Sequence, residues 1–488
     1  MNPISTKIPI RLRRPLPLPD VLGTVHIPDP LSPGMAGLAS YLTRRHARIT
    51  ISPVQADLRP ELVERLERHG AVLRGAAPGT ASLVWGGDNT VTHDITSHIA
   101  GHGLPMMGYA RAIELLAGTA PITVAVAGSH STTMAAAALT CALVSRDPGW
   151  ILAEAPMGDT AGYDGGGEVL VVDLCPDGSS HETSPPGWRF RTLGEGLSPT
   201  VTLVTAVDAA PPAFWNQQEA LDQMEDLARR SDTVVVWAAQ PGCKELADRL
   251  RRHRPGPRVV TVGRGTDMDV QVLRTFWTGE DHRVTVQADG ERHTFTVPVA
   301  GTNNAMAVAA ACAAGWALGV PGRELVDGLG AFAGVERSLT RLGSTGGIDV
   351  VESRAVHPKE IAADLQGARM LTEGAVVAVY EPSGHLRSNA LASLIAEALG
   401  AADRTVLLPV HSTFPRGQNH ADGGESILNA SSTGTVIRFE SDLHRQGSEA
   451  LVASLVQQGD LILTIGSQAA RRIGPSLLAA LHRPQPAR

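Results

Sequence analysis

The sequence contains very little lysine. Lys7, Lys244 and Lys359 are the only lysines among 42 basic residues, which stand against 49 acidic residues. The resulting formal net charge of −7 is small for a chain of 488 residues. A weak negative charge of this kind gives no basis for nucleic-acid binding.

Cysteine and long apolar runs are also scarce. The four cysteines, Cys141, Cys175, Cys243 and Cys312, are scattered without C-x-x-C spacing, which argues against structural zinc and against a disulfide framework. No apolar run reaches membrane-spanning length, and no apolar signal core occupies the N-terminus. We therefore expect a cytoplasmic protein that does not bind membranes. A G-x-S-x-G elbow is absent as well, which argues against a serine hydrolase.

What is present is an alternation of strand and helix patterns along nearly the whole chain. The length predicts about three domains. Short β-branched runs without polar alternation indicate parallel strands that are covered on both faces. Helical patterns lie between them, so we predict an α/β fold with three domains, at residues 21–118, 119–333 and 334–488.

One stretch predicts a phosphate-binding loop. Ile122–Ala127 reads as a buried strand, and an alanine-rich helix follows a loop of small residues. In a P-loop, backbone N–H groups and a helix N-terminus surround a polyphosphate. The candidate anion-binding residues are Gly128, Ser129, His130, Ser131, Thr132 and Thr133. A tight strand-to-helix turn retained for folding is the alternative interpretation.

Several further segments occur in a particular order. They are Ala127-Gly-Ser-His, Gly301-Thr-Asn-Asn, Phe332-Ala-Gly-Val-Glu-Arg and His357-Pro-Lys-Glu. This order resembles the Mur ligase family from about His26 to the C-terminus. The resemblance implies an N-terminal Rossmann-like domain that binds a UDP-sugar, a central P-loop ATPase-like domain and a C-terminal Rossmann-like domain.

The resemblance also implies site residues. Asp173 stands at the family's acidic magnesium position, and Asn304 at a nucleotide contact, although Asn304 also suits a helix N-cap. Arg387 matches an arginine near the family's substrate site and would grip a carboxylate. His357 and His411 are further catalytic candidates, but His357 equally fits the start of a helix and His411 a solvated loop.

The chain departs from the family pattern at important positions. Thr132 replaces the P-loop lysine, Pro211 the metal-binding histidine, and Ser338 an arginine, while Asp29 lies in the first loop, where it would repel a diphosphate. Losing several preorganised contacts would leave little ATP-driven turnover.

From these losses we expect a protein that no longer performs ATP-driven ligation. It would serve as a repurposed enzyme or binding protein in specialised biosynthesis. Its ligand would be a small-molecule carboxylate, an amino acid or a nucleotide-like compound, and a protein partner or homodimer is compatible with the sequence. The alternative is a divergent but active carboxylate–amine ligase that uses ATP and Mg²⁺.

Overall fold

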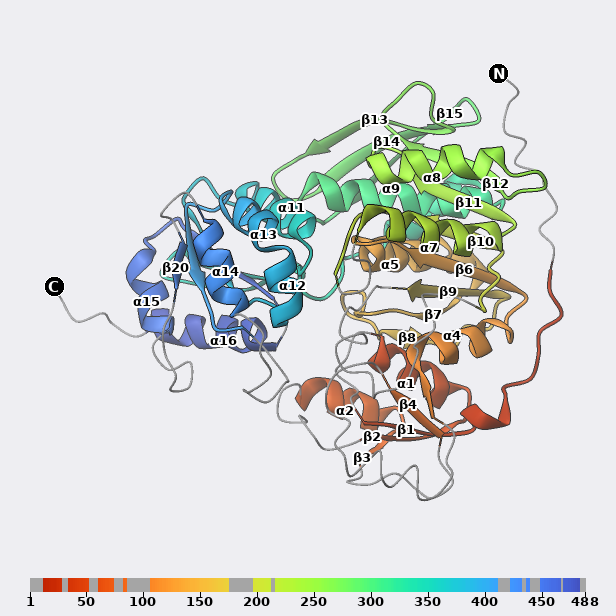
Figure 1. Ribbon diagram of the computed structural model, residues 1–488, viewed down its shortest axis with the longest axis horizontal. Helices are drawn as coiled ribbons and strands as arrows, with labels where there is room; N and C mark the ends of the chain where they lie inside the picture. Colours follow the sequence, from red (N-terminus) through yellow and green to blue (C-terminus); the bar gives the residue numbers. More distant parts are fainter. Residues whose placement is uncertain are drawn as a thin grey trace. The chain divides into compact units, whose positions relative to one another are not determined.

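The computed structural model describes residues 12–28, 34–51, 60–73, 82–85, 106–174, 196–211, 216–410, 422–431, 436–438, 448–466 and 468–482. The described chain forms two compact units. The first comprises residues 1–276, 282–298 and 304–335, and the second comprises residues 277–281, 299–303 and 336–488. Mostly parallel sheets flanked by helices make up both units, which confirms the predicted α/β fold (Figure 1).

The first unit begins with a small parallel sheet in the order β3-β2-β1-β4-β5. Its strands are β1 (Thr24–Ile27), β2 (Arg48–Ile51), β3 (Val72–Leu73), β4 (Ser82–Trp85) and β5 (Met106–Gly108). The helices are η1 (Asp20–Leu22), α1 (Met35–Arg44), α2 (Pro60–Arg68) and α4 (Tyr109–Ala117).

A second sheet in the same unit has the order β15-β14-β13-β12-β11-β10-β6-β9-β7-β8. Its strands are β6 (Ile122–Ala127), β7 (Gly149–Ile151), β8 (Gly162–Tyr163), β9 (Val169–Leu174), β10 (Val201–Val204), β11 (Thr233–Trp237), β12 (Arg258–Gly263), β13 (Val270–Trp277), β14 (His282–Ala288) and β15 (Glu291–Val297). The associated helices are α5 (Thr132–Ala142), η3 (Val144–Arg146), α7 (Gln217–Arg229), α8 (Pro241–Arg252), α9 (Thr302–Ala317) and α10 (Gly322–Leu329).

The register of the second sheet decides where a site can form. β6 pairs in parallel with β9 and β10, with Val126 opposite Asp173 and Ala127 opposite Val204. The residues that follow these strands therefore meet at one edge of the sheet. In open α/β sheets this carboxyl edge is where ligands bind.

The two sheets of the first unit pack through α1 and the β7–β8 hairpin. A Cβ atom added at Gly162 would lie 1.8 Å from the Gly37 carbonyl oxygen, so both backbones touch and neither position admits a side chain without a shift. Beside this contact, Arg44 lies 4.6 Å from the Tyr163 ring centroid, and Tyr163 stacks on Trp150. Most of the predicted domains 21–118 and 119–333 thus lies in one unit, apart from residues 277–281 and 299–303. The boundaries of these domains stay a prediction.

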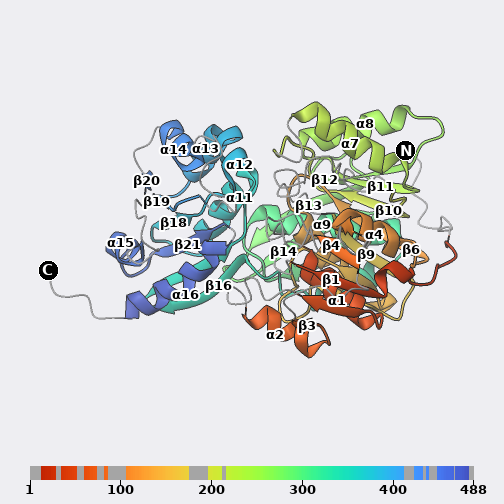
Figure 2. The same ribbon diagram turned by 60° about the horizontal axis from the view of Figure 1, so that its bottom comes forward.

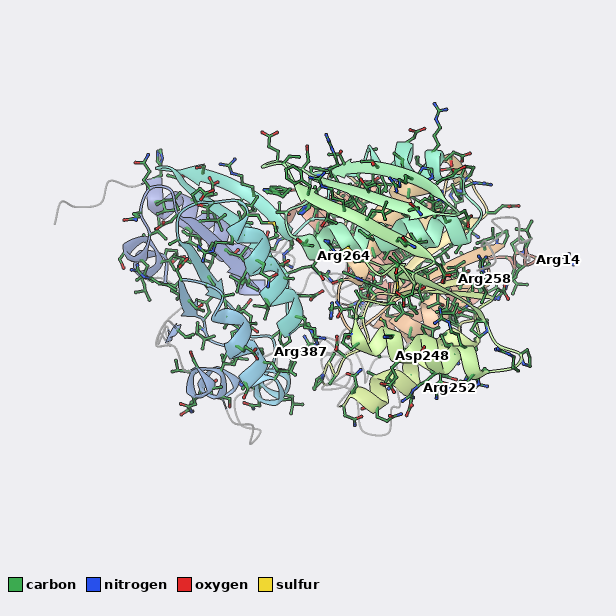
Figure 3. The ribbon with its side chains drawn as sticks, turned by 90° about the horizontal axis from the view of Figure 1, so that it is seen from above. Arg14, Asp248, Arg252, Arg258, Arg264 and Arg387 are labelled. Atoms are coloured by element: carbon green, nitrogen blue, oxygen red, sulfur yellow. The ribbon has the colours of Figure 1, made fainter. Side chains whose placement is uncertain are left out.

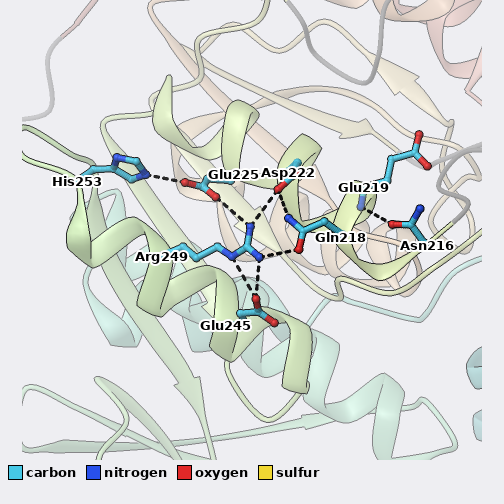
Figure 4. Close-up of polar contacts among 8 residues, drawn as sticks. All are labelled: Asn216, Gln218, Glu219, Asp222, Glu225, Glu245, Arg249 and His253. Atoms are coloured by element: carbon cyan, nitrogen blue, oxygen red, sulfur yellow. Dashed lines mark hydrogen bonds and ion pairs between the residues drawn. The ribbon is translucent and has the colours of Figure 1, made fainter.

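Helices α7 and α8 lie side by side over β10, β11 and β12 (Figure 2). Figure 4 shows polar contacts between them: Arg249 on α8 lies 3.0 Å from an oxygen of Asp222 on α7, and His253, just after α8, lies 2.6 Å from an oxygen of Glu225 on α7. Within α8 itself, Arg249 lies 2.8 Å from a Glu245 oxygen. Exposed ion pairs of this kind typically contribute about 1 kcal/mol or less. Asp248 and Arg252 lie on the same helix and are labelled in Figure 3. The contacts of Arg249 and His253 therefore link α8 to α7.

The second unit contains one sheet, in the order β16-β17-β21-β18-β19-β20. Its strands are β16 (Ser338–Thr345), β17 (Ile348–Ser353), β18 (Val376–Tyr380), β19 (Arg404–Leu407), β20 (Val436–Arg438) and β21 (Leu461–Ile465). Its helices are α11 (Pro358–Arg369), α12 (His385–Ala390), α13 (Ala392–Leu399), α14 (Gly423–Ala430), α15 (Ser448–Leu455) and α16 (Gln468–His482).

Alternate strand residues of this sheet enter two separate cores. Val351 and Leu463 pack with Leu365 of α11, whereas Val350 and Ile462 pack with Ile473 of α16. Helices therefore cover both faces, as the absence of polar alternation in these strands predicts. Within the described residues, no helix combines the length and apolarity needed to cross a membrane.

Candidate functional site

The predicted phosphate loop joins β6 to α5 at the carboxyl edge of the second sheet. Ser131, directly before α5, adopts a left-handed conformation with φ 63°, and Gly128 has φ 154°. A Cβ atom at Gly128 would lie 2.3 Å from the Thr205 hydroxyl oxygen, so only glycine fits there. The loop conformation is therefore fixed by its backbone and its neighbours.

Hydrogen bonds to the segment after β10 hold this loop. The Ser129 amide donates to the Ala206 carbonyl at 3.0 Å, and the Thr205 hydroxyl donates to the His130 carbonyl at 2.6 Å. The Asp208 amide donates to the Ser129 hydroxyl at 3.0 Å. None of these contacts uses the side chain of Thr132, so the geometry of the loop does not depend on a lysine at that position.

Asp173, the predicted metal residue, lies beside the first turn of α5. Its carboxylate accepts a 2.7 Å hydrogen bond from the Thr133 hydroxyl and a 3.2 Å bond from the Ala153 amide, and the residue is 1% exposed. In P-loop nucleotide-hydrolysing enzymes, a loop hydroxyl and an acid at a strand end hold Mg²⁺. Oxygen donors suit this hard cation, which keeps several of its waters. Thr133 and Asp173 therefore fit Mg²⁺.

The beginning of α1 reaches the same place. Gly34, with φ 80°, precedes α1, and its amide donates to the Ala153 carbonyl at 3.4 Å. A Cβ atom at Gly34 would lie 2.7 Å from the Tyr109 ring, and the Tyr109 hydroxyl donates to the Asp173 carbonyl at 3.3 Å. A ligand bound at the N-terminus of α1 would thus lie next to the Thr133–Asp173 pair. Asp29, the departure predicted in the preceding loop, falls outside the described residues.

Both ring nitrogens of His130 lie close to polar side chains. Its Nε2 atom lies 3.2 Å from an Asp208 carboxylate oxygen, and its Nδ1 atom lies 3.0 Å from the Ser131 hydroxyl. The His130 side chain is 2% exposed. The three side chains form a chain of hydrogen bonds that ends inside the phosphate loop.

The other predicted site residues are spread over the two units. Asn304 lies inside α9, which begins at Thr302, so the expectation that Asn304 caps this helix is wrong. His357 caps α11 by accepting a 3.3 Å hydrogen bond from the Lys359 amide. Arg387 lies on α12, where Figure 3 labels it. His411 lies outside the described residues, and catalytic roles for His357 and Arg387 stay predictions.

A buried ion pair lies at the carboxyl ends of β17 and β21 in the second unit. The Arg337 guanidinium donates to Glu352, which is in β17, at 2.7 Å and to the Gly466 carbonyl, just after β21, at 2.6 Å. Both charged side chains are at most 10% exposed. Arg337 belongs to the Phe-x-Gly-Val-x-Arg segment noted in the sequence, and here it joins the ends of two neighbouring strands.

Ser353 and Asp364 form a second polar pair near this edge. The Ser353 hydroxyl donates to an Asp364 carboxylate oxygen at 2.5 Å. Burial raises the pKa of Asp364 from 3.8 to about 7, against the lowering effect of the Ser353 hydrogen bond. The protonated form of Asp364 is thus favoured in the folded state.

We expect this shift to make stability depend on pH. The pKa of Asp364 is higher in the folded protein than in the unfolded chain. The stability that this carboxyl group contributes is therefore complete below about pH 4 and is progressively lost as pH rises to about 7. One pKa unit corresponds to about 1.4 kcal/mol, which makes a few kcal/mol the upper bound. Asp364→Asn should abolish this loss, as denaturant titrations at pH 5 and 8 would reveal. An unchanged pH dependence in the variant would contradict the assignment.

Sequence reasoning missed the partners that complete these sites. Tyr109 and Ala153 contact Asp173, but neither residue carries a motif. Arg337 was visible only as part of a matched segment. The signal that could have found Tyr109 is its position at the start of a helix that follows a strand of the first sheet.

The chain is similar, over almost its whole length, to proteins that are named as ligases. No protein-family model matches the chain. A UDP-N-acetylmuramate–L-alanine ligase of Streptomyces coelicolor is 30% identical over 96% of this chain and 99% of its own length. A Streptomyces avermitilis protein with the same name is 28% identical over 96% of this chain and 99% of its own length.

Solved structures agree on the fold. A UDP-N-acetylmuramate–alanine ligase from Thermotoga maritima superposes with a TM-score of 0.69 at 17% identity, over 93% of this chain and 98% of that one. A murein peptide ligase from Psychrobacter arcticus superposes with a TM-score of 0.69 at 18% identity, over 95% of this chain and 100% of that one.

These relatives correct the function expected from the sequence. The expectation of a protein that has lost ligation and been repurposed is wrong, because similarity to proteins named as ligases extends over almost the entire chain. The departures at Thr132, Pro211 and Ser338 do not disrupt the loop, because its backbone hydrogen bonds and the Thr133–Asp173 pair form without these side chains. The chain belongs to the Mur ligase family.

Proposed function

We propose that the protein is an ATP-dependent ligase that joins the carboxylate of a nucleotide-linked sugar acid to the amino group of an amino acid. The observation that carries this proposal is the Thr133–Asp173 pair beside a phosphate loop, in a chain whose full-length relatives are named UDP-N-acetylmuramate–L-alanine ligases. By analogy with those names, UDP-N-acetylmuramate and L-alanine are the substrates to test first. Because the reaction consumes ATP, we place it in the cytoplasm.

The reaction proceeds in two balanced steps. A carboxylate oxygen of the first substrate attacks the γ-phosphorus of ATP, and ADP leaves with the electron pair of the broken P–O bond. The amino group of the second substrate then attacks the acyl carbon, inorganic phosphate leaves, and a proton is lost from nitrogen. The products are an amide, ADP and phosphate.

The described residues support the first step. The N–H groups of the loop and the N-terminus of α5 suit the phosphates of ATP. Thr133 and Asp173 would hold Mg²⁺, which supplies charge neutralisation between phosphate oxygens when it is bound. Gly34 and Tyr109 place the start of α1 beside this pair, which suits delivery of a carboxylate from the first sheet.

We also propose a role for one residue of the second unit. Arg387 would bind a carboxylate with its planar guanidinium, as the family resemblance implies. The domain limits at residues 118 and 333 likewise stay proposals. A protein partner or homodimer is a separate expectation that the proposed reaction does not require.

The test is a reconstituted reaction with UDP-N-acetylmuramate, L-alanine and Mg-ATP. We expect ADP release together with an equal amount of amide product, identified by mass spectrometry. Omitting the carboxylate, the amine or ATP in turn should abolish the product. A panel of other amino acids and carboxylates follows if this pair is inactive.

Two results would contradict the proposal. One is the absence of any amide product across the panel while the protein stays folded. The other is ADP release that is the same with and without the carboxylate, since this would indicate simple ATP hydrolysis. Asp173→Asn serves as the matched inactive control.

A further inference from the structure

We propose that the segment 153–159 couples the binding of Mg²⁺ at Asp173 to Gly334 and Val335, the last residues of the first unit before the chain enters the second. The segment lies between β7 and β8 in the chain. It acts as a positioning element and does not itself bind the metal. This inference rests on the proposed function, because it assumes that Asp173 holds Mg²⁺.

One end of the segment is bound to the candidate metal site. The Ala153 amide donates at 3.2 Å to Oδ2 of Asp173, the same oxygen that accepts the Thr133 hydroxyl at 2.7 Å. The Ala153 carbonyl accepts the Gly34 amide at 3.4 Å. Ala153 and Asp173 are both buried, so water competes little for these bonds. The orientation of the Asp173 carboxylate therefore depends on where the Ala153 peptide lies.

The other end of the segment is bound to the last two residues of the first unit. Pro156 and Val335 form an isolated antiparallel bridge, and the Met157 amide donates to the Gly334 carbonyl at 3.0 Å. The Asp159 amide donates to the Pro156 carbonyl at 3.0 Å, which closes a turn directly after the bridge. The turn thus fixes the direction of the amide that contacts Gly334.

Further hydrogen bonds restrain the segment where it leaves the sheet and where it returns. The Leu152 amide donates to the Ala161 carbonyl at 2.8 Å, and Arg65 of α2 donates to the Asp159 carbonyl at 3.0 Å. We expect the short backbone between these restraints to move as one piece, so that a change at either end reaches the other.

Coupling through the segment works in both directions. A carboxylate that is already held in place binds Mg²⁺ without first having to be oriented, so loss of the hold weakens metal binding. Conversely, Mg²⁺ that fixes the Asp173 carboxylate stabilises the segment and its bonds to Gly334 and Val335. Thermodynamic linkage requires the two effects to be equal in size. Couplings of this kind typically change an affinity by about 5- to 150-fold.

Met157→Pro is the main variant, because it removes the N–H group that donates to the Gly334 carbonyl. Gly158 has φ 80° at the third position of the turn, as in a type II turn, and proline suits the second position of that turn. Pro156 is extended in the bridge, which is the conformation that a residue before proline prefers. Met157→Ala is the matched control, since it keeps the amide and removes a side chain that is 40% exposed.

The first measurement is ADP release by the full-length protein as a function of Mg²⁺ concentration. We expect Met157→Pro to require about five- to tenfold more Mg²⁺ for half-maximal rate, with kcat within about twofold of the wild type once Mg²⁺ saturates. Met157→Ala should match the wild type. A lower kcat with an unchanged Mg²⁺ requirement would overturn the coupling, because general damage to the fold acts in that way.

The second measurement is amide hydrogen exchange without nucleotide, which monitors one end of the segment while the other is altered. Met157→Pro should speed exchange of the Ala153 amide by at least about fivefold. Asp173→Asn should speed exchange of the Met157 amide, because a neutral amide oxygen accepts the Ala153 hydrogen bond more weakly than a carboxylate does. Unchanged exchange at the distant end in both variants would overturn the proposal.

The outcomes separate this inference from the proposed function. Exchange that responds at both ends, in a protein that forms no amide product, would support the coupling and count against the ligase. Ligase activity with the same Mg²⁺ requirement in wild type and Met157→Pro would overturn the coupling and leave the ligase standing. If Met157→Pro does not fold, as circular dichroism would show, exchange of the Met157 amide in Asp173→Asn decides the matter.

Discussion

Asp173→Asn is expected to lower the rate of ATP-dependent turnover by roughly 10²–10³-fold, the usual effect of losing one preorganised electrostatic contact. The Asp173 carboxylate is buried and accepts hydrogen bonds from the Thr133 hydroxyl and the Ala153 amide. Asparagine is nearly the same size but lacks the negative charge with which a carboxylate attracts Mg²⁺. Steady-state ADP release over a range of Mg²⁺ concentrations would measure the loss.

Matched variants of Thr133 test whether the pair works as a unit. Thr133→Ser keeps the hydroxyl and should stay close to wild type, whereas Thr133→Val keeps the shape and should lose most of the activity. Because the two side chains share one hydrogen bond, Thr133→Val combined with Asp173→Asn should cost much less than the product of the single effects. Turnover by Asp173→Asn within about threefold of wild type would rule out its role as a metal ligand.

Local patterns in the sequence were sufficient for the loop but not for its partners. The strand Ile122–Ala127 and the following helix were predictable because an apolar run leads into a loop of small residues and then an alanine-rich stretch. The contact between Thr133 and Asp173 joins residues 40 positions apart, and that between His130 and Asp208 joins residues 78 apart. Both require the parallel pairing of β6 with β9 and β10, which a single sequence does not encode in any one segment.

The error about function has a related origin. Thr132 and Ser338 are losses that can be seen directly in the sequence, whereas hydrogen bonds made by backbone groups leave no residue signature. The contacts of Ser129, His130 and Asp208 preserve the loop geometry without a lysine. Some strands were also difficult to predict. β7 and β8 have only three and two residues, and β16, although it has eight residues, pairs with shifts in register.

Arg337→Met is expected to destabilise the second unit by about 3–5 kcal/mol, because it leaves a buried charge without its partner. Glu352 is 5% exposed, and the Arg337 guanidinium donates both to Glu352 and to the Gly466 carbonyl. Arg337→Lys keeps the charge but replaces the planar fork with a single ammonium, so its effect should be intermediate. Urea unfolding followed by circular dichroism would measure the shift in the transition of this unit.

The double variant Arg337→Met with Glu352→Leu separates the strength of the ion pair from the cost of an unpaired charge. Replacing both buried charges with apolar side chains of similar size is often neutral or stabilising, so most of the lost stability should return. A double variant as unstable as Arg337→Met alone would mean that the bond to the Gly466 carbonyl carries the effect. In that case Arg337 acts by joining the ends of β17 and β21, and Glu352 serves mainly to keep the guanidinium in place.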